Sequence, residues 1–228
     1  MSARWLARMV LARLDEIAND DGTDWLSDDE AGRLQAMTSQ ARRRSFLAGH
    51  WQARVLAAEW LQADARRIAL HRHDDGRPLL LVDGAPSSLS LSLSHSGDWL
   101  AIALATVPVG VDVEMPRRAR DLRALARFTF SPEEVAGLDH LDEAGYSAAF
   151  HRVWTLKESR GKRSGIGLLP AASRRVTALP SDAGTADATS WAFGEGALSL
   201  AIEPGMQVEI VGGEGLHTPA HWRYREDV

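Results

Sequence analysis

The spacing of apolar and polar residues predicts helices followed by strands, and it does so twice along the chain. Residues 25–40 and 42–62 both show helical spacing. In the second segment the apolar residues fall on one stripe, made of Phe46, Leu47, Trp51, Val55, Ala58 and Leu61. Ser27, with Glu30 three residues later, forms a capping box that predicts where the first helix begins.

Strand patterns follow these two helices. Residues 74–78 (DDGRP) predict a turn, and leucines then alternate with serines over 89–94, which predicts a half-buried strand. Residues 99–107 are apolar throughout and predict a buried strand, which Pro108 ends. Residues 111–114 predict a further short strand.

The same order recurs in the second part of the chain. Residues 120–128 and 131–162 are mainly helical in pattern, and residues 198–202 and 206–210 alternate like two antiparallel strands. This doubling predicts an α+β protein in two halves. The halves are residues 1–115 and 116–228.

Composition narrows the class of protein. The chain has 228 residues, 45% of them hydrophobic, a formal net charge of −5 and no cysteine. An acidic chain does not indicate nucleic-acid binding, and the absence of cysteine excludes disulfides, thiol nucleophiles and thiolate metal sites. The N-terminal segment has no cleavage signature, and no apolar run approaches the roughly 20 residues of a membrane span. We therefore expect a cytoplasmic protein that binds neither membranes nor nucleic acid.

Two carboxylates stand two residues apart in GVDVE, residues 110–114. Because side chains alternate in a strand, Val111 and Val113 can face a core while Asp112 and Glu114 project together from the other face. Two carboxylates this close suit a hard divalent cation such as Mg²⁺. The alternative is an ordinary strand with a solvated polar face.

A second charged segment, WTLKESRGK, occupies residues 154–162. Trp154, Glu158 and Lys162 are spaced by four, so they share one face of a helix. Glu158 could be a third metal ligand and Lys162 a phosphate contact. The alternative is a packed Trp below an exposed Glu–Lys pair worth a few tenths of a kcal/mol.

A histidine ends the leucine–serine strand in SLSHSG, residues 92–97. His95, with Ser94 and Ser96 beside it, could bind a phosphate, or it could be an ordinary surface residue. Neighbouring Ser and His point to opposite faces of a strand, so they are not a hydrolase pair, and no nucleophile elbow is present. Neither nucleotide-binding glycine fingerprint occurs in the chain.

In order, GRP, SLSHSG, GVDVE and WTLKESRGK resemble the motifs of the 4′-phosphopantetheinyl transferases, of the larger, single-chain type that the surfactin synthetase activator (Sfp) typifies. The resemblance covers roughly residues 27 to 170. It implies an α+β pseudo-dimer of two similar halves, with the first carrying the adenine side and two metal ligands, and the second carrying the third ligand and the carrier side. It also implies a monomer that transfers the phosphopantetheine arm of coenzyme A (CoA) to a carrier-protein serine and releases 3′,5′-ADP.

The resemblance implies a role for each matching residue. Asp112, Glu114 and Glu158 match metal ligands for Mg²⁺, and Mn²⁺ suits the same oxygen site. Glu158 and Lys162 match the catalytic positions, with Glu158 as the candidate base and Lys162 on the reacting phosphates. The positions that match CoA contacts are Arg33, Arg44, Arg77, Pro78, Ser94 and His95.

Two positions depart from the family pattern. Glu30 lies where some members have a basic residue, so we expect a less positive pocket for the CoA 3′-phosphate. Gly161 replaces a bulkier residue and lowers helix propensity by about 1 kcal/mol relative to Ala. We therefore expect a weak point in the helix just before Lys162.

Arginines cluster directly after GVDVE. In a net acidic chain, Arg117, Arg118, Arg120 and Arg123 could dock an acidic acyl or peptidyl carrier protein, or could be a solvated helix face.

Two rival functions remain as alternatives to the transferase. One is another Mg²⁺-dependent phosphate-transferring or phosphate-hydrolysing enzyme, and the other is a non-catalytic binding module that keeps the fold.

Overall fold

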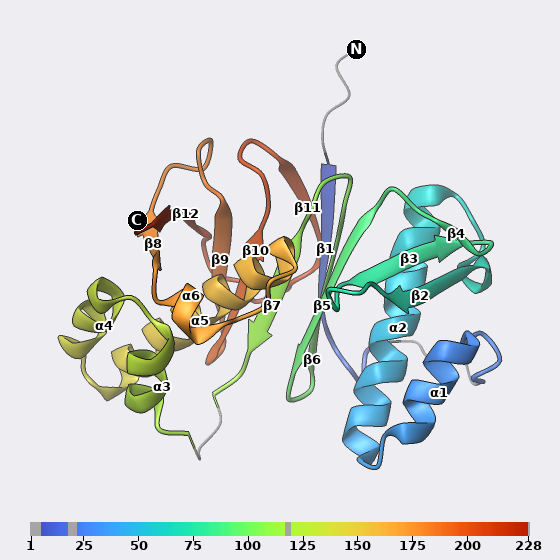
Figure 1. Ribbon diagram of the computed structural model, residues 1–228, viewed down its shortest axis with the longest axis horizontal. Helices are drawn as coiled ribbons and strands as arrows, with labels where there is room; N and C mark the ends of the chain where they lie inside the picture. The colour runs from blue at the N-terminus through green and yellow to red at the C-terminus, as the bar shows by residue number, and fades with distance from the viewer. Residues whose placement is uncertain (1–5, 18–21, 117–119, 228) are drawn as a thin grey trace.

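The chain folds into two larger β-sheets that lie side by side, with helices on their outer faces (Figure 1). The computed structural model describes residues 6–17, 22–116 and 120–227. The predicted α+β class is confirmed. The helices are α1 (Asp28–Ala36), α2 (Gln40–Leu61), α3 (Leu122–Thr129), α4 (Pro132–Asp139), α5 (Glu143–Ser164) and α6 (Pro170–Ser173).

The first sheet has the strand order β11-β1-β6-β5, and the second has the order β7-β10-β9-β12-β8. A small sheet, β2-β3-β4, packs beside α2. The strands are β1 (Leu6–Arg13), β2 (Ile68–Arg72), β3 (Pro78–Val82), β4 (Ala85–Pro86), β5 (Ser90–Ser96), β6 (Trp99–Ala105), β7 (Gly110–Glu114), β8 (Val176–Pro180), β9 (Ala188–Phe193), β10 (Gly196–Ala201), β11 (Gln207–Gly212) and β12 (Ala220–Glu226).

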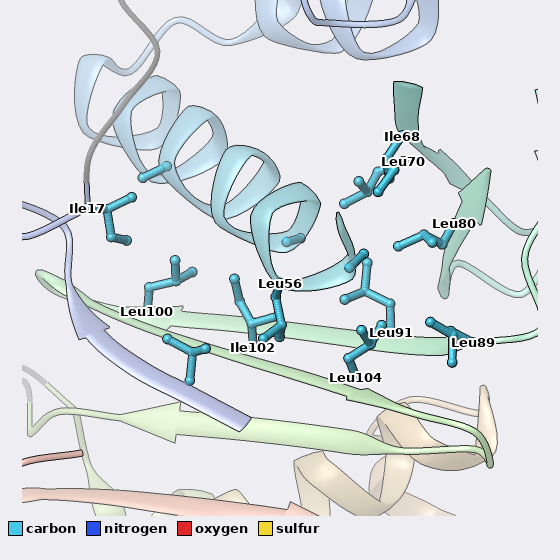
Figure 2. Close-up of a cluster of buried hydrophobic side chains, with 14 of the residues drawn as sticks. Ile17, Leu56, Ile68, Leu70, Leu80, Leu89, Leu91, Leu100, Ile102 and Leu104 are labelled. Atoms are coloured by element: carbon cyan, nitrogen blue, oxygen red, sulfur yellow. The ribbon is translucent and has the colours of Figure 1, made fainter. Parts of the chain in front are cut away.

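Helix α2 closes the core of the first half. Leu56 of α2, which the predicted stripe did not include, meets Leu100, Ile102 and Leu104 of β6, as Figure 2 shows. These four side chains are at most 2% exposed. Each such buried side chain contributes about 1.5–3 kcal/mol relative to an exposed one. The predicted stripe is therefore displaced from the buried face of α2, because of its six residues only Phe46 is buried and Leu61 is exposed.

Local polar residues set the helix boundaries. The predicted capping box at Ser27 and Glu30 is present at the start of α1. The region 131–162 divides into α4 and α5, because Asp142 accepts from the backbone N–H of Gly145 and begins a new helix. Helix α5 ends at Gly165, whose positive φ of 75° permits the left-handed C-cap.

The prediction of an antiparallel pair over 198–202 and 206–210 is wrong. Strand β10 lies in the second sheet, whereas β11 crosses to the first sheet and pairs in parallel with β1, from Leu6 opposite Gln207 to Leu11 opposite Gly212. Gly205, at a φ of 79°, lies in the turn that separates the two strands. Alternating apolar residues predict a strand but carry no information about its partner.

Strands β5 and β7 lie at the junction of the two larger sheets and belong to different sheets. Serines of β5 face the backbone of β7 and of the residue before it: Val109 N–H donates to Ser90 Oγ at 3.2 Å, and Val111 N–H donates to Ser92 Oγ at 3.0 Å. The serine face of the leucine–serine strand is therefore packed against the second half. Strand β7 itself pairs with β10, so it belongs to the second sheet.

Candidate active site

The carboxylates of β7 point toward β5 and away from the apolar core. Val111 and Val113 are buried in that core, as the alternation predicts. Asp112 is only 5% exposed, and Ser94 Oγ donates to its Oδ1 at 2.7 Å. Its second oxygen, Oδ2, is buried without a hydrogen-bond partner. The alternative of a solvated polar face is therefore wrong for Asp112.

Lys162 reaches the same point from helix α5. Its Nζ lies 2.8 Å from Asp112 Oδ1 and also donates to the carbonyl oxygens of Val111 and Leu93, at 3.0 and 3.3 Å. The ammonium therefore bridges β5 and β7. Lys162 is thus a fixed cation at the junction of the sheets rather than half of an exposed helical ion pair.

The expected weak point at Gly161 is not found, because α5 runs unbroken to Ser164. The following loop folds back onto Gly161, whose carbonyl accepts from Gly167 N–H at 3.0 Å. A Cβ on Gly161 would lie 2.6 Å from the Gly167 carbonyl group. The close packing of this loop therefore requires glycine and offsets its low helix propensity.

Glu158 lies one helical turn before Lys162. Burial raises its pKa to about 7, and repulsion from the neighbouring carboxylates Asp112 and Glu114 adds to this rise. The three carboxylates thus share one electrostatic environment. Glu158 is also half-buried, so it is not simply an exposed helical residue.

The donor set fits a hard cation. Within the described residues, no three His, Asp, Glu or Cys side chains already form a metal cluster. Mg²⁺ does not need one, since it usually takes one or two carboxylates together with waters and substrate phosphates. The unpartnered Asp112 Oδ2 and the mutual repulsion felt by Glu158 are the features that a divalent cation would relieve.

A basic cavity of about 710 Å³ adjoins this carboxylate site. It lies among α2, the β2–β3 hairpin, β5 and the end of α5, and Lys162 lines it. The structure brings four of the predicted CoA contacts together in its wall: Arg33, Arg77, Pro78 and His95.

Four further basic residues line the cavity: Arg42, His50, His71 and Arg72. The sequence motifs did not point to these four residues. A signal for two of them was available. Arg42 and His50 are spaced by four from Phe46, so all three share one helix face. Phe46 stacks on the His50 ring, with 3.8 Å between the ring centroids.

Two predicted CoA contacts lie elsewhere. Arg44 lines a separate cavity that contains Trp25 and Leu47. It is two residues from Arg42 on a helix with 3.6 residues per turn, so the two side chains point to nearly opposite faces. The hydroxyl of Ser94 faces Asp112 rather than the basic cavity.

The expectation that Glu30 makes the pocket less positive is also wrong, because Glu30 is fully buried between α1 and α2. Its carboxylate forms an ion pair with Arg54 and lies 2.5 Å from His50 Nδ1. Burial alone would raise the pKa of Glu30, but these hydrogen bonds outweigh it and lower the pKa to about 2. Its charge is thus compensated inside the protein.

The predicted docking arginines are only partly observed. Arg117 and Arg118 lie outside the described residues. Arg120 is exposed. Arg123 instead forms ion pairs with Asp139 and Glu143, at 3.3 and 3.2 Å, and lies over the Tyr146 ring. Its guanidinium is therefore already engaged within the second half.

In the described ranges, no helix is both long enough and apolar enough to cross a membrane.

Comparison with known proteins identifies the sequence class of both halves. A model described as the 4′-phosphopantetheinyl transferase superfamily matches residues 108–201. A second model, described as the N-terminal part of 4′-phosphopantetheinyl transferase, matches residues 21–107. The two matches meet just before β7, where the structure divides the sheets.

Several curated relatives carry the same description. The 4′-phosphopantetheinyl transferase AcpT of Salmonella typhimurium is 37% identical over 141 residues, which cover 59% of this chain and 68% of AcpT. HetI of Nostoc sp., also a 4′-phosphopantetheinyl transferase, is 30% identical over 158 residues, which cover 69% of this chain and 67% of HetI. A phosphopantetheinyl transferase of Thraustochytrium sp. is 29% identical over 173 residues, covering 71% of this chain but only 60% of its own length.

Proposed function

Because the chain belongs to the 4′-phosphopantetheinyl transferase superfamily, we propose that it transfers the 4′-phosphopantetheine arm of CoA to a serine of an apo carrier protein, with Mg²⁺ as cofactor and 3′,5′-ADP as product. One observation carries the proposal. Lys162 lines the basic cavity and at the same time contacts Asp112, so an anionic ligand in the cavity would lie beside the carboxylate site.

The cavity suits the nucleotide end of CoA. Its volume of about 710 Å³ is within the usual range of roughly 300–1,000 Å³ for small-molecule sites. Arginines Arg33, Arg42, Arg72 and Arg77 would pair with the 3′-phosphate and pyrophosphate, since guanidinium groups bind phosphate oxygens in a bidentate manner. His95 would contribute a further donor to these phosphates.

Asp112, Glu114 and Glu158 would hold the cation. When bound, Mg²⁺ supplies charge neutralisation for the pyrophosphate oxygens. Asp112 and Glu114 approach from β7 and Glu158 from α5, so the site would draw on a strand and a helix that pack against each other. Mn²⁺ prefers the same oxygen ligands and would substitute.

The reaction itself needs positioning and one proton transfer. The carrier serine hydroxyl would attack the β-phosphorus of CoA, the P–O bond to the departing 3′,5′-ADP would break, and the serine proton would pass to Glu158. Glu158 would act as the general base, either directly or through a water. Lys162 would stabilise the charge that develops on the phosphoryl oxygens.

We also infer that the two halves are a pseudo-dimer. A capping-box helix precedes a 22-residue helix in each half: α1 before α2, and α4 before α5. In each half the buried glutamate of the capping box pairs with a basic residue of the long helix, Glu30 with Arg54 and Glu134 with Lys157. Such a repeat supports a monomer, in which the second half does the work of a partner subunit.

The carrier would dock near the end of β7 that bears Glu114. Arg120 follows β7 in the chain and is exposed, so it would attract an acidic carrier surface. Arg117 and Arg118 of the predicted dock lie outside the described residues. A cytoplasmic location remains our expectation, because the chain has no cysteine to suggest an oxidising compartment.

Formation of 3′,5′-ADP tests this proposal against the rival enzyme class. The protein would be incubated with CoA and Mg²⁺, with and without an apo carrier, and the nucleotide product would be separated and quantified. We expect 3′,5′-ADP only when carrier, CoA and metal are all present. Equal release without carrier would indicate a CoA-hydrolysing enzyme, and no CoA binding at all would favour a non-catalytic module.

A further inference from the structure

We propose that Ser94 and Ser96 are positioning residues that orient the carboxylates of Asp112 and Glu114 for the cation. The inference rests on the proposed function and assigns two β5 residues a place behind its metal site. Ser94 Oγ donates to Asp112 Oδ1, and Ser96 Oγ donates to Glu114 Oε2, each at 2.7 Å. These distances are short, as expected for hydroxyl–carboxylate hydrogen bonds.

Four serines of β5 form one row, because residues spaced by two share a strand face. Ser90 and Ser92 accept hydrogen bonds from the β7 backbone and do not touch a carboxylate. From Ser94 onward the row gains a second role, since Ser94 and Ser96 donate to the two carboxylates. The change falls where β7 presents its acidic residues. Backbone hydrogen bonds across the junction account for Ser90 and Ser92, but they do not account for the bonds that Ser94 and Ser96 donate to carboxylates.

The hydrogen bond of Ser96 has a fixed direction. Its side chain is fully buried, and Met115 N–H donates to its Oγ at 3.0 Å. With that acceptor site occupied by an amide, the hydroxyl proton is aimed at Glu114. A chain of hydrogen bonds therefore runs from the backbone of β7, through Ser96, to the Glu114 carboxylate and fixes its rotamer.

Ser94 acts on Asp112 in a complementary way. Both Ser94 and Lys162 contact Oδ1, which leaves the buried Oδ2 without a partner. One oxygen of Asp112 is thus held by the protein and the other is kept available. Outer hydrogen bonds of this kind hold carboxylate ligands in a binding orientation, and their loss typically lowers metal affinity by about 10–100-fold.

The test is Mn²⁺ binding to the purified full-length protein, measured by isothermal titration and by the loss of the free-ion electron paramagnetic resonance signal. Ser94→Ala and Ser96→Ala are each expected to weaken Mn²⁺ binding by about tenfold or more. Ser90→Ala is the matched control, because it removes a serine of the same row that bonds only backbone. Ser94→Thr keeps a hydroxyl and should restore most of the affinity.

Two further measurements distinguish carboxylate positioning from a phosphate contact and from a loss of folding. CoA affinity in EDTA should be unchanged in Ser94→Ala, whereas a loss there would mean that Ser94 contacts phosphate and would overturn the proposal. Unchanged thermal midpoints would exclude unfolding as the cause of weaker Mn²⁺ binding. Should both alanine variants bind Mn²⁺ as Ser90→Ala does, the positioning role is refuted while the transferase proposal stands. Absence of Mn²⁺ binding by the wild type, with and without CoA, would overturn the metal site and both proposals.

Discussion

Two glutamates, Glu158 and Glu30, lie in opposite electrostatic surroundings. Burial and neighbouring carboxylates raise the pKa of Glu158 to about 7. Hydrogen bonds from His50 and Arg54 lower the pKa of Glu30 to about 2 in spite of its burial. A group whose ionised form is disfavoured is a candidate for chemistry, whereas a group whose ionised form is favoured is a candidate for stability.

The first prediction concerns Glu158→Gln. This change removes a metal ligand and the proposed base while keeping the shape of the side chain. We expect the rate of carrier modification to fall by about 10²–10⁴-fold, the usual contribution of a general base. The measurement is the initial rate at saturating CoA and Mg²⁺.

Glu59→Gln is the control for Glu158→Gln. Its carboxylate is mostly exposed on the other long helix and has only a distant ion pair with Arg8, at 3.9 Å. We expect it to leave the rate unchanged. A rate near that of wild type for Glu158→Gln at saturating Mg²⁺ would remove Glu158 from both proposed roles.

The second prediction concerns the stability that Glu30 contributes. Because folding lowers its pKa from 4.5 to about 2, the contribution is fully present above about pH 4.5 and is lost as the pH falls toward 2. The change in pKa corresponds to about 3 kcal/mol. Glu30→Gln should therefore lower the free energy of unfolding by about this amount at pH 7, with a gap from wild type that narrows in acid.

Urea unfolding at several pH values measures this gap. Asp29→Asn is the control, since Asp29 is exposed and its ion pair with Arg33, at 3.9 Å, is expected to contribute less than about 1 kcal/mol. A gap between wild type and Glu30→Gln that stays constant from pH 7 to pH 2 would contradict the assignment.

At the scale of single residues, local spacing in the sequence predicted which side chains share a face of a strand or helix. The alternation in GVDVE predicted that Asp112 and Glu114 face away from the core, and spacing by four placed Glu158 and Lys162 on one helix face. It could not predict that Lys162 contacts Asp112, because fifty residues of chain separate them. Nor could it predict the partner of Glu30, since a capping-box glutamate is normally exposed at a helix end.

At the scale of elements, the site depends on how closely α5 packs against β7. Gly110 is the first residue of β7, and a Cβ there would overlap the carbonyl oxygen of Ser159 in α5. Because that obstacle is backbone, it cannot move aside as a flexible side chain can. The glycine in GVDVE is therefore explained by helix–strand packing rather than by a turn.

The third prediction is that Gly110→Ala pushes α5 away from β7. We expect a loss of stability of about 1–3 kcal/mol, typical of overpacking, and weaker metal binding, because Glu158 would move relative to Asp112. The matched control is Gly137→Ala in α4, where a Cβ meets nothing within 4 Å. That change should be neutral or stabilise by about 0.5–1 kcal/mol. Equal thermal midpoints for the two variants would refute the packing argument.

Element types were easier to predict than element partners. Hydrophobic alternation identified strands around 198–202 and 206–210, yet the pair it suggested does not form, because β11 joins β1 about 200 residues earlier in the chain. The serines of β5 gave no sign in the sequence that they face a second sheet. Strand pairing is decided by which edges tertiary packing brings together.

At the scale of the whole molecule, the two halves are connected by β11, which comes from the second half and pairs with β1 in the first sheet. The first sheet consists of β1, β5 and β6 from the first half and β11 from the second. Apolar residues of both halves, including Met9 and Leu198, share one buried cluster. The two halves therefore share one of their buried clusters.

The fourth prediction is that the protein unfolds in a single cooperative step. Tryptophan fluorescence and far-UV circular dichroism should give the same urea midpoint, because loss of either half exposes the shared core. Two separated transitions would show that the halves are independent domains.

The central claim is that this chain attaches phosphopantetheine to a carrier protein. The most direct test is the intact mass of an apo carrier protein after incubation with the protein, CoA and Mg²⁺, beside a sample containing EDTA. The account predicts a mass gain equal to one phosphopantetheine, present with Mg²⁺ and absent with EDTA. No gain on carriers of several classes, from a protein that is folded and binds CoA, would contradict it.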